Sequence, residues 1–170
     1  MDGTRLRLGV GVIIVWLLTG CAPAEPPLSI GEAVPLESDV LEVSLTVTAV
    51  TTSDFESLGL TGLFTDVPPD GVPWLVDYRL DLASGVRADF SWDAVPSLTA
   101  SAWTATSTSG EQVEAAKVQG AGIQDWCPGY QTDLPDDVVG TYCHVFILPD
   151  GQELDEVSIA DVATWTINPE

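Results

Sequence analysis

The chain has 170 residues, with 26 acidic side chains against 5 basic ones and a formal net charge of −21 at pH 7. Affinity for nucleic-acid phosphate depends on Lys and Arg, so this composition argues against DNA or RNA as a partner. The same charge disfavours adsorption to anionic lipid. The length suits one domain with a sizeable core.

The N-terminus has the three parts of an export signal in the required order. Arg5 and Arg7 supply positive charge, and residues 8–18 form an apolar run. This run is shorter than the roughly 20 apolar residues that span a bilayer. Small residues at positions 19–20 then precede Cys21. We therefore expect residues 1–20 to be a cleaved signal peptide.

The sequence Leu18-Thr19-Gly20-Cys21 resembles the lipobox of bacterial lipoproteins at all four of its positions. The resemblance implies cleavage behind Gly20 and a diacylglyceryl group on the Cys21 sulfur. Each buried acyl CH₂, as in a palmitate chain, contributes about 0.8 kcal/mol, and two chains hold a protein where one does not. The expected location is extracytoplasmic, lipid-anchored to the cell membrane. The alternatives are an ordinary secretory signal with a chance cysteine, or an uncleaved membrane anchor.

Behind the lipobox, residues 21–38 mix Pro, Glu and Ala without a period, which predicts a flexible tether. From residue 39 to 170 the patterns are those of a folded domain. Alternation over residues 40–53 predicts a half-buried strand whose core face carries Leu41, Val43, Leu45, Val47 and Ala49. Residues 72–85 repeat this pattern, with a predicted core face of Trp74, Val76, Tyr78, Leu80 and Leu82.

Further along the chain, residues 86–92 predict a short strand, and a Ser- and Thr-rich stretch surrounds Trp103. The stretch 111–126 is the only candidate for a helical turn, and Gly120 and Gly122 cut it short. A loop over 128–140 leads into a strand over 140–149 with apolar residues on both faces, which predicts a central strand. A turn at 149–151 precedes a last pair of strands.

About seven short strands with regular turns and almost no helix predict an all-β fold, an antiparallel β-sandwich. The order of features resembles the immunoglobulin-like domains of small cell-surface lipoproteins of Gram-positive bacteria, including actinobacteria. What matches is a long first strand after a lipidated tether, and the late stretch VVGTYCHVFILPDGQELDEVSI with its Gly, alternating apolar residues, Pro and turn. The similarity spans residues 40–168 and bears on the fold rather than on an activity.

The cysteine count is informative because it is small. With Cys21 assigned to lipid, Cys127 and Cys143 remain, and outside the cytoplasm two such thiols most simply form a disulfide. Closing a loop of about 16 residues contributes roughly 3 kcal/mol in the chain-entropy model. The alternative is a metal site with His144, but neighbouring residues of a strand point to opposite faces. The sequence favours the disulfide.

Catalytic motifs give little support for an enzyme. A hydrolase triad needs a histidine, and the single candidate, His144, lies within a predicted strand. The sequence contains neither a Gly-x-Ser-x-Gly elbow nor a phosphate-binding Gly-rich loop. Paired carboxylates could hydrolyse sugars, but some pairing is unavoidable at this acidic content. We therefore expect a structural histidine and a non-enzymatic protein.

Two kinds of binding site remain as candidates. Loop carboxylates at Asp133, Asp136 and Asp137 could hold calcium. However, their spacing is not that of an EF-hand, and Asp is common in turns for local reasons. No cofactor is therefore expected, with calcium as the alternative.

The tryptophans divide into two groups. Trp74 and Trp165 fall on apolar strand faces and are predicted core residues, whereas Trp92, Trp103 and Trp126 could form an exposed platform for sugars. For these three, packing in the core or under a loop is the favoured interpretation. The favoured function is a non-enzymatic, immunoglobulin-like module that binds a protein partner in the envelope. The alternatives are a carbohydrate- or cell-wall-binding module and, after it, a calcium-binding or hydrolytic domain.

Overall fold

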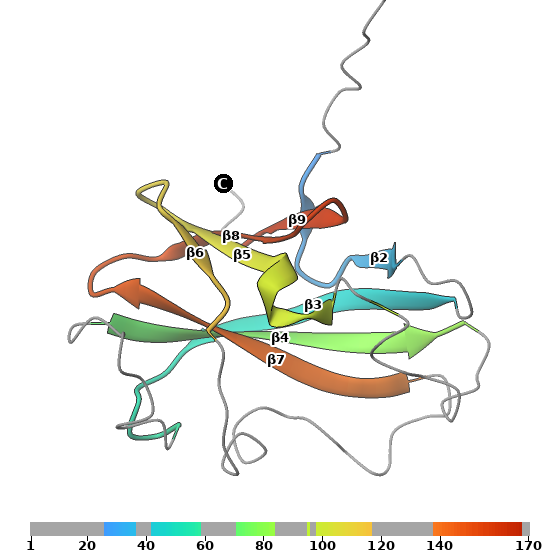
Figure 1. Ribbon diagram of the computed structural model, residues 1–170, viewed down its shortest axis with the longest axis horizontal. Coiled ribbons are helices and arrows are strands. Elements are labelled where there is room, and N and C mark those ends of the chain that lie inside the picture. The colour runs from blue at the N-terminus through green and yellow to red at the C-terminus, as the bar shows by residue number, and fades with distance from the viewer. Residues whose placement is uncertain are drawn as a thin grey trace, which may run out of the picture.

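The computed structural model describes residues 26–36, 42–58, 71–83, 95, 98–116 and 138–167. Within these ranges the chain forms nine β-strands and one short 3-10 turn at Ala100–Ala102, with no α-helix. The strands make two sheets stacked face to face (Figure 1). The prediction of an all-β sandwich is confirmed.

One sheet has four antiparallel strands in the order β2-β3-β4-β7. Its strands are β2 (Ala33–Leu36), β3 (Val43–Thr52), β4 (Gly71–Leu82) and β7 (Val138–Pro149). The other sheet has five strands in the order β1-β9-β8-β5-β6, and its β1–β9 pair is parallel. Its strands are β1 (Leu28–Ser29), β9 (Ala163–Thr166), β8 (Leu154–Ile159), β5 (Trp103–Ser107) and β6 (Gln112–Glu114).

The alternation predicted for β4 is observed. Its inward-facing side chains from Val76 to Leu82 are at most 2% exposed, and Trp74 packs against the same core. Between them, Arg79 faces outward and pairs with Asp81 at 3.0 Å between Nε and Oδ2. The period of two therefore identified the buried face of this strand correctly.

The predicted core face of β3 is wrong beyond Val47, because the strand carries a β-bulge. The register with β4 shifts between Val47 and Ala49, so that Ala49 lies opposite Asp77 and Val50 lies opposite Val76. Val50, rather than Ala49, then packs against the core. One extra residue in a strand exchanges the two faces for every residue that follows it. Leu41, also predicted on this face, lies outside the described residues.

Strand β7 carries buried side chains on both of its faces. Val145 on one face and Phe146 on the other are both buried, as the apolar pattern predicts. Within the described residues, β7 stands at the end of the four-stranded sheet and pairs with β4. Its other edge receives a backbone hydrogen bond from Ala116 N to Val145 O at 2.7 Å, from the chain that follows β6.

The predicted tether is also shorter than expected. Residues 28–36 form β1 and β2, and the chain crosses from one sheet to the other between them (Figure 1). Val34 and Leu36 turn toward the core, whereas Pro35 occupies an edge strand, where a missing N–H is tolerated. Among the described residues, the sandwich therefore begins at Leu28 rather than at residue 39.

Candidate functional site

Two of the predicted site residues, Trp103 and Cys143, are among the described residues. The others lie outside them: Cys21, Trp92, Trp126, Cys127, Asp133, Asp136 and Asp137. Their predicted roles in lipidation, sugar binding, disulfide formation and calcium binding stay predictions. Cys143 is half-buried on β7, where it lies opposite Asp77 of β4.

Trp103 is not part of an exposed platform. Its side chain is 0% exposed, at the start of β5 and inside the sandwich. A sugar-binding tryptophan must offer one face of its ring to solvent, so the ligand-binding role proposed for Trp103 is wrong and the packing interpretation is correct. Trp165, predicted as core, is equally buried.

Aromatic side chains from both sheets meet around Trp103. We call this group the aromatic cluster, and its members are Tyr78, Trp103, Tyr142, His144 and Trp165. The ring centroid of Trp103 lies 4.9 Å from that of Tyr78 and 4.7 Å from that of His144. Its indole stacks on Trp165 at 6.4 Å with an interplanar angle of 8°. The cluster therefore joins β5 and β9 of one sheet to β4 and β7 of the other.

His144 lies at the meeting point of the two sheets. Its ring stacks on Tyr78 at 5.3 Å, and the Tyr78 Oη and His144 Nε2 atoms are 3.4 Å apart. Burial lowers the pKa of His144 to about 4, because a charged imidazolium is poorly solvated there. Burial, together with the neighbouring Tyr142 hydroxyl, raises the pKa of Tyr78. Both groups are therefore uncharged near pH 7.

The indole N–H groups of the buried tryptophans differ in their hydrogen bonding. Trp165 Nε1 donates to the Glu32 carbonyl oxygen at 3.2 Å, which fastens the β1–β2 connection to β9. Trp103 Nε1 and Trp74 Nε1 are buried and have no hydrogen-bond partner among the described residues. Such an unpaired donor is costly, since its hydration is lost without replacement.

A partly buried carboxyl lies on the outer face of the four-stranded sheet. Asp77 alternates with Tyr78 on β4 and therefore points away from the aromatic cluster. Burial raises the pKa of Asp77, and its Oδ1 atom has no hydrogen-bond partner in the described part of the chain. Among the described residues, no three His, Cys, Asp or Glu side chains are grouped as a metal site would require.

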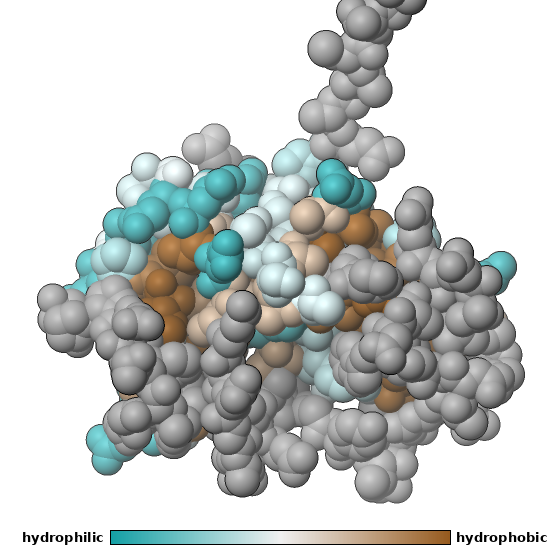
Figure 2. All heavy atoms as spheres, viewed as in Figure 1, coloured by the Kyte–Doolittle hydropathy of each residue, from teal (hydrophilic) through white to brown (hydrophobic). Residues whose placement is uncertain are grey.

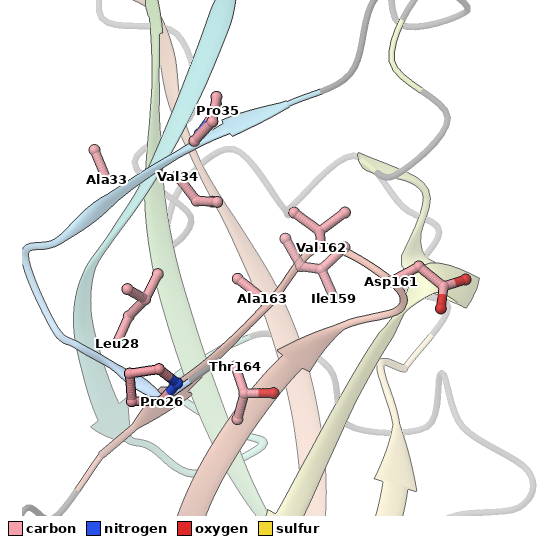
Figure 3. Close-up of a pocket in the computed structure, with 10 residues that line it drawn as sticks. All are labelled: Pro26, Leu28, Ala33, Val34, Pro35, Ile159, Asp161, Val162, Ala163 and Thr164. Atoms are coloured by element: carbon pink, nitrogen blue, oxygen red, sulfur yellow. The ribbon is translucent and has the colours of Figure 1, made fainter. Parts of the chain in front are cut away.

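A hollow of about 410 Å³ opens beside the β1–β2 crossing and the β8–β9 turn (Figure 3). Most of its lining is aliphatic: Pro26, Leu28, Ala33, Val34, Pro35, Ile159, Val162 and Ala163. Asp161 and Thr164 complete it, and Asp161 has a positive φ of 59° in the turn. Ligand pockets usually combine apolar walls with a few converging polar groups. This hollow offers only one carboxyl and one hydroxyl.

The surface over the five-stranded sheet is polar (Figure 2). Its outward positions carry the hydroxyls of Thr104, Thr106, Ser158, Thr164 and Thr166 and the carboxylates of Glu114 and Glu156. Ile30 is the one exposed large hydrophobic side chain in the described ranges, at 36%. No helix in those ranges is long and apolar enough to cross a bilayer.

Comparison of the chain with protein-family models, with curated proteins and with solved structures gave no match.

Proposed function

We propose that the protein is an extracytoplasmic lipoprotein, held on the cell membrane by a diacylglyceryl group on Cys21. The lipobox at Leu18-Thr19-Gly20-Cys21, behind a charged start and an apolar run, is the observation that carries this proposal. The position of the first strand supports it, because β1 begins at Leu28 and six residues, 22–27, separate it from the cysteine. Such a linker would keep the sandwich close to the bilayer.

The sandwich itself would be a non-enzymatic, immunoglobulin-like module that binds a protein in the envelope. Two features of the described residues support binding rather than catalysis. The single histidine has its ring packed between Tyr78 and Trp103, where it serves the core. The outer face of the five-stranded sheet carries Glu114 and Glu156, and Arg79 is the sole Lys or Arg side chain in the described ranges. A partner rich in Lys or Arg would be drawn to such a surface.

A disulfide between Cys127 and Cys143 belongs to the same proposal. An exported chain meets an oxidising environment, and Cys143 is held on a long, well-packed strand. The bridge would tie the segment around residue 127 to β7. We propose no cofactor.

Substitution of Cys21 by Ala tests the anchor. The wild type and C21A are produced in a bacterium with lipoprotein processing, and each is partitioned between detergent and aqueous phases. We expect the wild type in the detergent phase and C21A in the aqueous phase or retained as an unprocessed precursor. A wild type that stays in the aqueous phase would contradict the proposal, as would a mature-sized C21A in the detergent phase.

Binding of the purified mature protein to isolated cell envelopes tests the module. The envelopes are used either intact or after complete digestion of their proteins. Loss of binding after digestion supports a protein partner. Binding that survives digestion would instead favour the carbohydrate-binding alternative, with Trp92 and Trp126 as the remaining candidates.

A further inference from the structure

The single histidine of the chain joins the two halves of the sandwich. His144 projects from β7 and contacts the Tyr78 ring, from its own sheet, and the Trp103 ring, from the opposite sheet. Its imidazole therefore fills the space between β4, β5 and β7. Any change in the charge of this ring acts directly on the contact between the sheets.

Neutral imidazole suits this position and imidazolium does not. The neutral ring can accept the Tyr78 hydroxyl proton at Nε2, across 3.4 Å. Protonation turns that nitrogen into a donor and adds a charge that needs solvation. Contact with the Tyr78 and Trp103 rings offsets part of this cost through cation–π attraction, but burial outweighs it and holds the pKa of His144 at about 4.

No carboxylate of the neighbouring strands faces the imidazole. On β4 the charged residues Asp77, Arg79 and Asp81 alternate with Tyr78 and lie on the other face of the sheet. On β7 the adjacent titratable groups are Tyr142, within the aromatic cluster, and Cys143, on the opposite face. Strand β5 has no titratable side chain, and Glu114 of β6 is exposed on the outer face of its sheet. Among the described residues of these strands, a protonated His144 therefore meets phenol and indole rings and no carboxylate.

We propose that His144 is an acid-operated latch: when protonated, its imidazole leaves the space between Tyr78 and Trp103 and turns to solvent, which loosens β7 from β5. This inference goes beyond the proposed function and does not depend on the lipid anchor. It concerns a reversible change in one part of the sandwich while the rest of the fold persists.

Three observations make the change local. His144 is mostly buried but not completely enclosed, so a rotation of its side chain suffices to reach water. Strand β7 lies at the end of the described four-stranded sheet and has one strand partner there. The vacated space borders Trp103, whose buried indole N–H has no partner in the described part of the chain and would bond to entering water. The core side chains that β3 and β8 contribute are aliphatic and do not titrate.

Nuclear magnetic resonance of the full mature chain tests the latch without ambiguity, because one histidine gives one imidazole signal. The imidazole Cε1–H signal and the indole N–H signals are followed from pH 7.5 to pH 3.5, with the Trp103 signal assigned from W103F. We expect the imidazole to titrate with a midpoint near pH 4. The Trp103 indole should shift with the same midpoint, and the Trp74 indole should remain unchanged.

The matched control is H144F, which keeps an aromatic ring in place but cannot be charged. Its Trp103 indole signal should not respond to pH over this range. An imidazole midpoint near 6.5 would overturn the proposal, since the ring would then be solvated at neutral pH. A Trp103 signal that ignores the imidazole titration, or simultaneous loss of all indole signals through global unfolding, would overturn it as well. If H144F does not fold, the wild-type titration alone decides between these outcomes.

Discussion

Replacing Trp103 or Trp165 by Phe should have unequal effects on stability, although the two side chains are matched in burial. Both are 0% exposed, and their indoles stack on each other at 6.4 Å. They differ in the indole N–H: Trp165 donates to the Glu32 carbonyl oxygen at 3.2 Å, whereas Trp103 has no partner among the described residues. Hydrogen bonding of the N–H is therefore the main variable that separates W165F from W103F.

The magnitudes follow from that difference. Both substitutions delete part of a buried ring and leave space behind, which costs about 1 to 2 kcal/mol when most of the side chain remains. W165F additionally loses one hydrogen bond, with a net contribution of about 1 kcal/mol. W103F instead removes a buried, unsatisfied donor, which raises the free energy of unfolding by about 1 to 3 kcal/mol and so offsets the packing loss. We expect W165F to be less stable than W103F by about 2 kcal/mol or more.

Urea denaturation at pH 7 measures this difference, with the free energy of unfolding taken by linear extrapolation. Unchanged slopes would show that both variants unfold from equally compact native states. An equal loss of unfolding free energy in the two variants, or a larger loss in W103F, would refute the claim that the Trp165 indole N–H is hydrogen-bonded and that of Trp103 is not.

Three further predictions concern titration, packing and covalent bonding. Because the folded pKa of His144, about 4, is below its ordinary 6.5, the unfolded chain takes up the proton first. We expect the free energy of unfolding of the wild type, relative to that of H144F, to fall by about 3 kcal/mol between pH 6.5 and pH 4 and to stay level at lower pH. A difference between the two proteins that does not change with pH would contradict the low pKa of His144. At Gly140 an added Cβ would lie 2.6 Å from Tyr142 Oη. G140A should therefore lower the free energy of unfolding by about 1 to 3 kcal/mol in the wild type and by clearly less in Y142A. A double-mutant cycle of denaturation measurements would show this difference. Replacing both Cys127 and Cys143 by Ala should lower stability by roughly 3 kcal/mol, and a thermally unchanged double variant would argue against the disulfide.

The faces of the strands were predictable where alternation is regular. Tyr78 and Leu80 were assigned to the core from the period of two alone, and the structure buries both. The bulge in β3 was not predictable, because Ala49 and Val50 are both apolar and either could continue the pattern. Strand β2 was missed because Pro35 and its acidic surroundings resemble a linker.

The aromatic cluster could not be predicted from the sequence, for a different reason. Alternation places His144 on the same face of its strand as Phe146, which points to the core. It does not say that β7 pairs with β4, nor that β5 of the other sheet lies across from both. Tyr78, Trp103 and His144 come together only through this long-range arrangement, which local patterns do not encode. The sequence alone therefore leaves Trp103 as a possible ligand-binding residue beside the favoured packing interpretation, and the structure buries it in the core.

The intact mass of the membrane-extracted protein, taken with thiol alkylation before and after reduction, tests the central claim most directly. The lipoprotein proposal predicts the mass of residues 21–170 plus acyl groups, with two alkylated thiols appearing only after reduction. A mass of the full chain, or of residues 21–170 without acyl groups, would contradict the anchor on Cys21. Alkylation of two thiols without reduction would contradict the disulfide between Cys127 and Cys143.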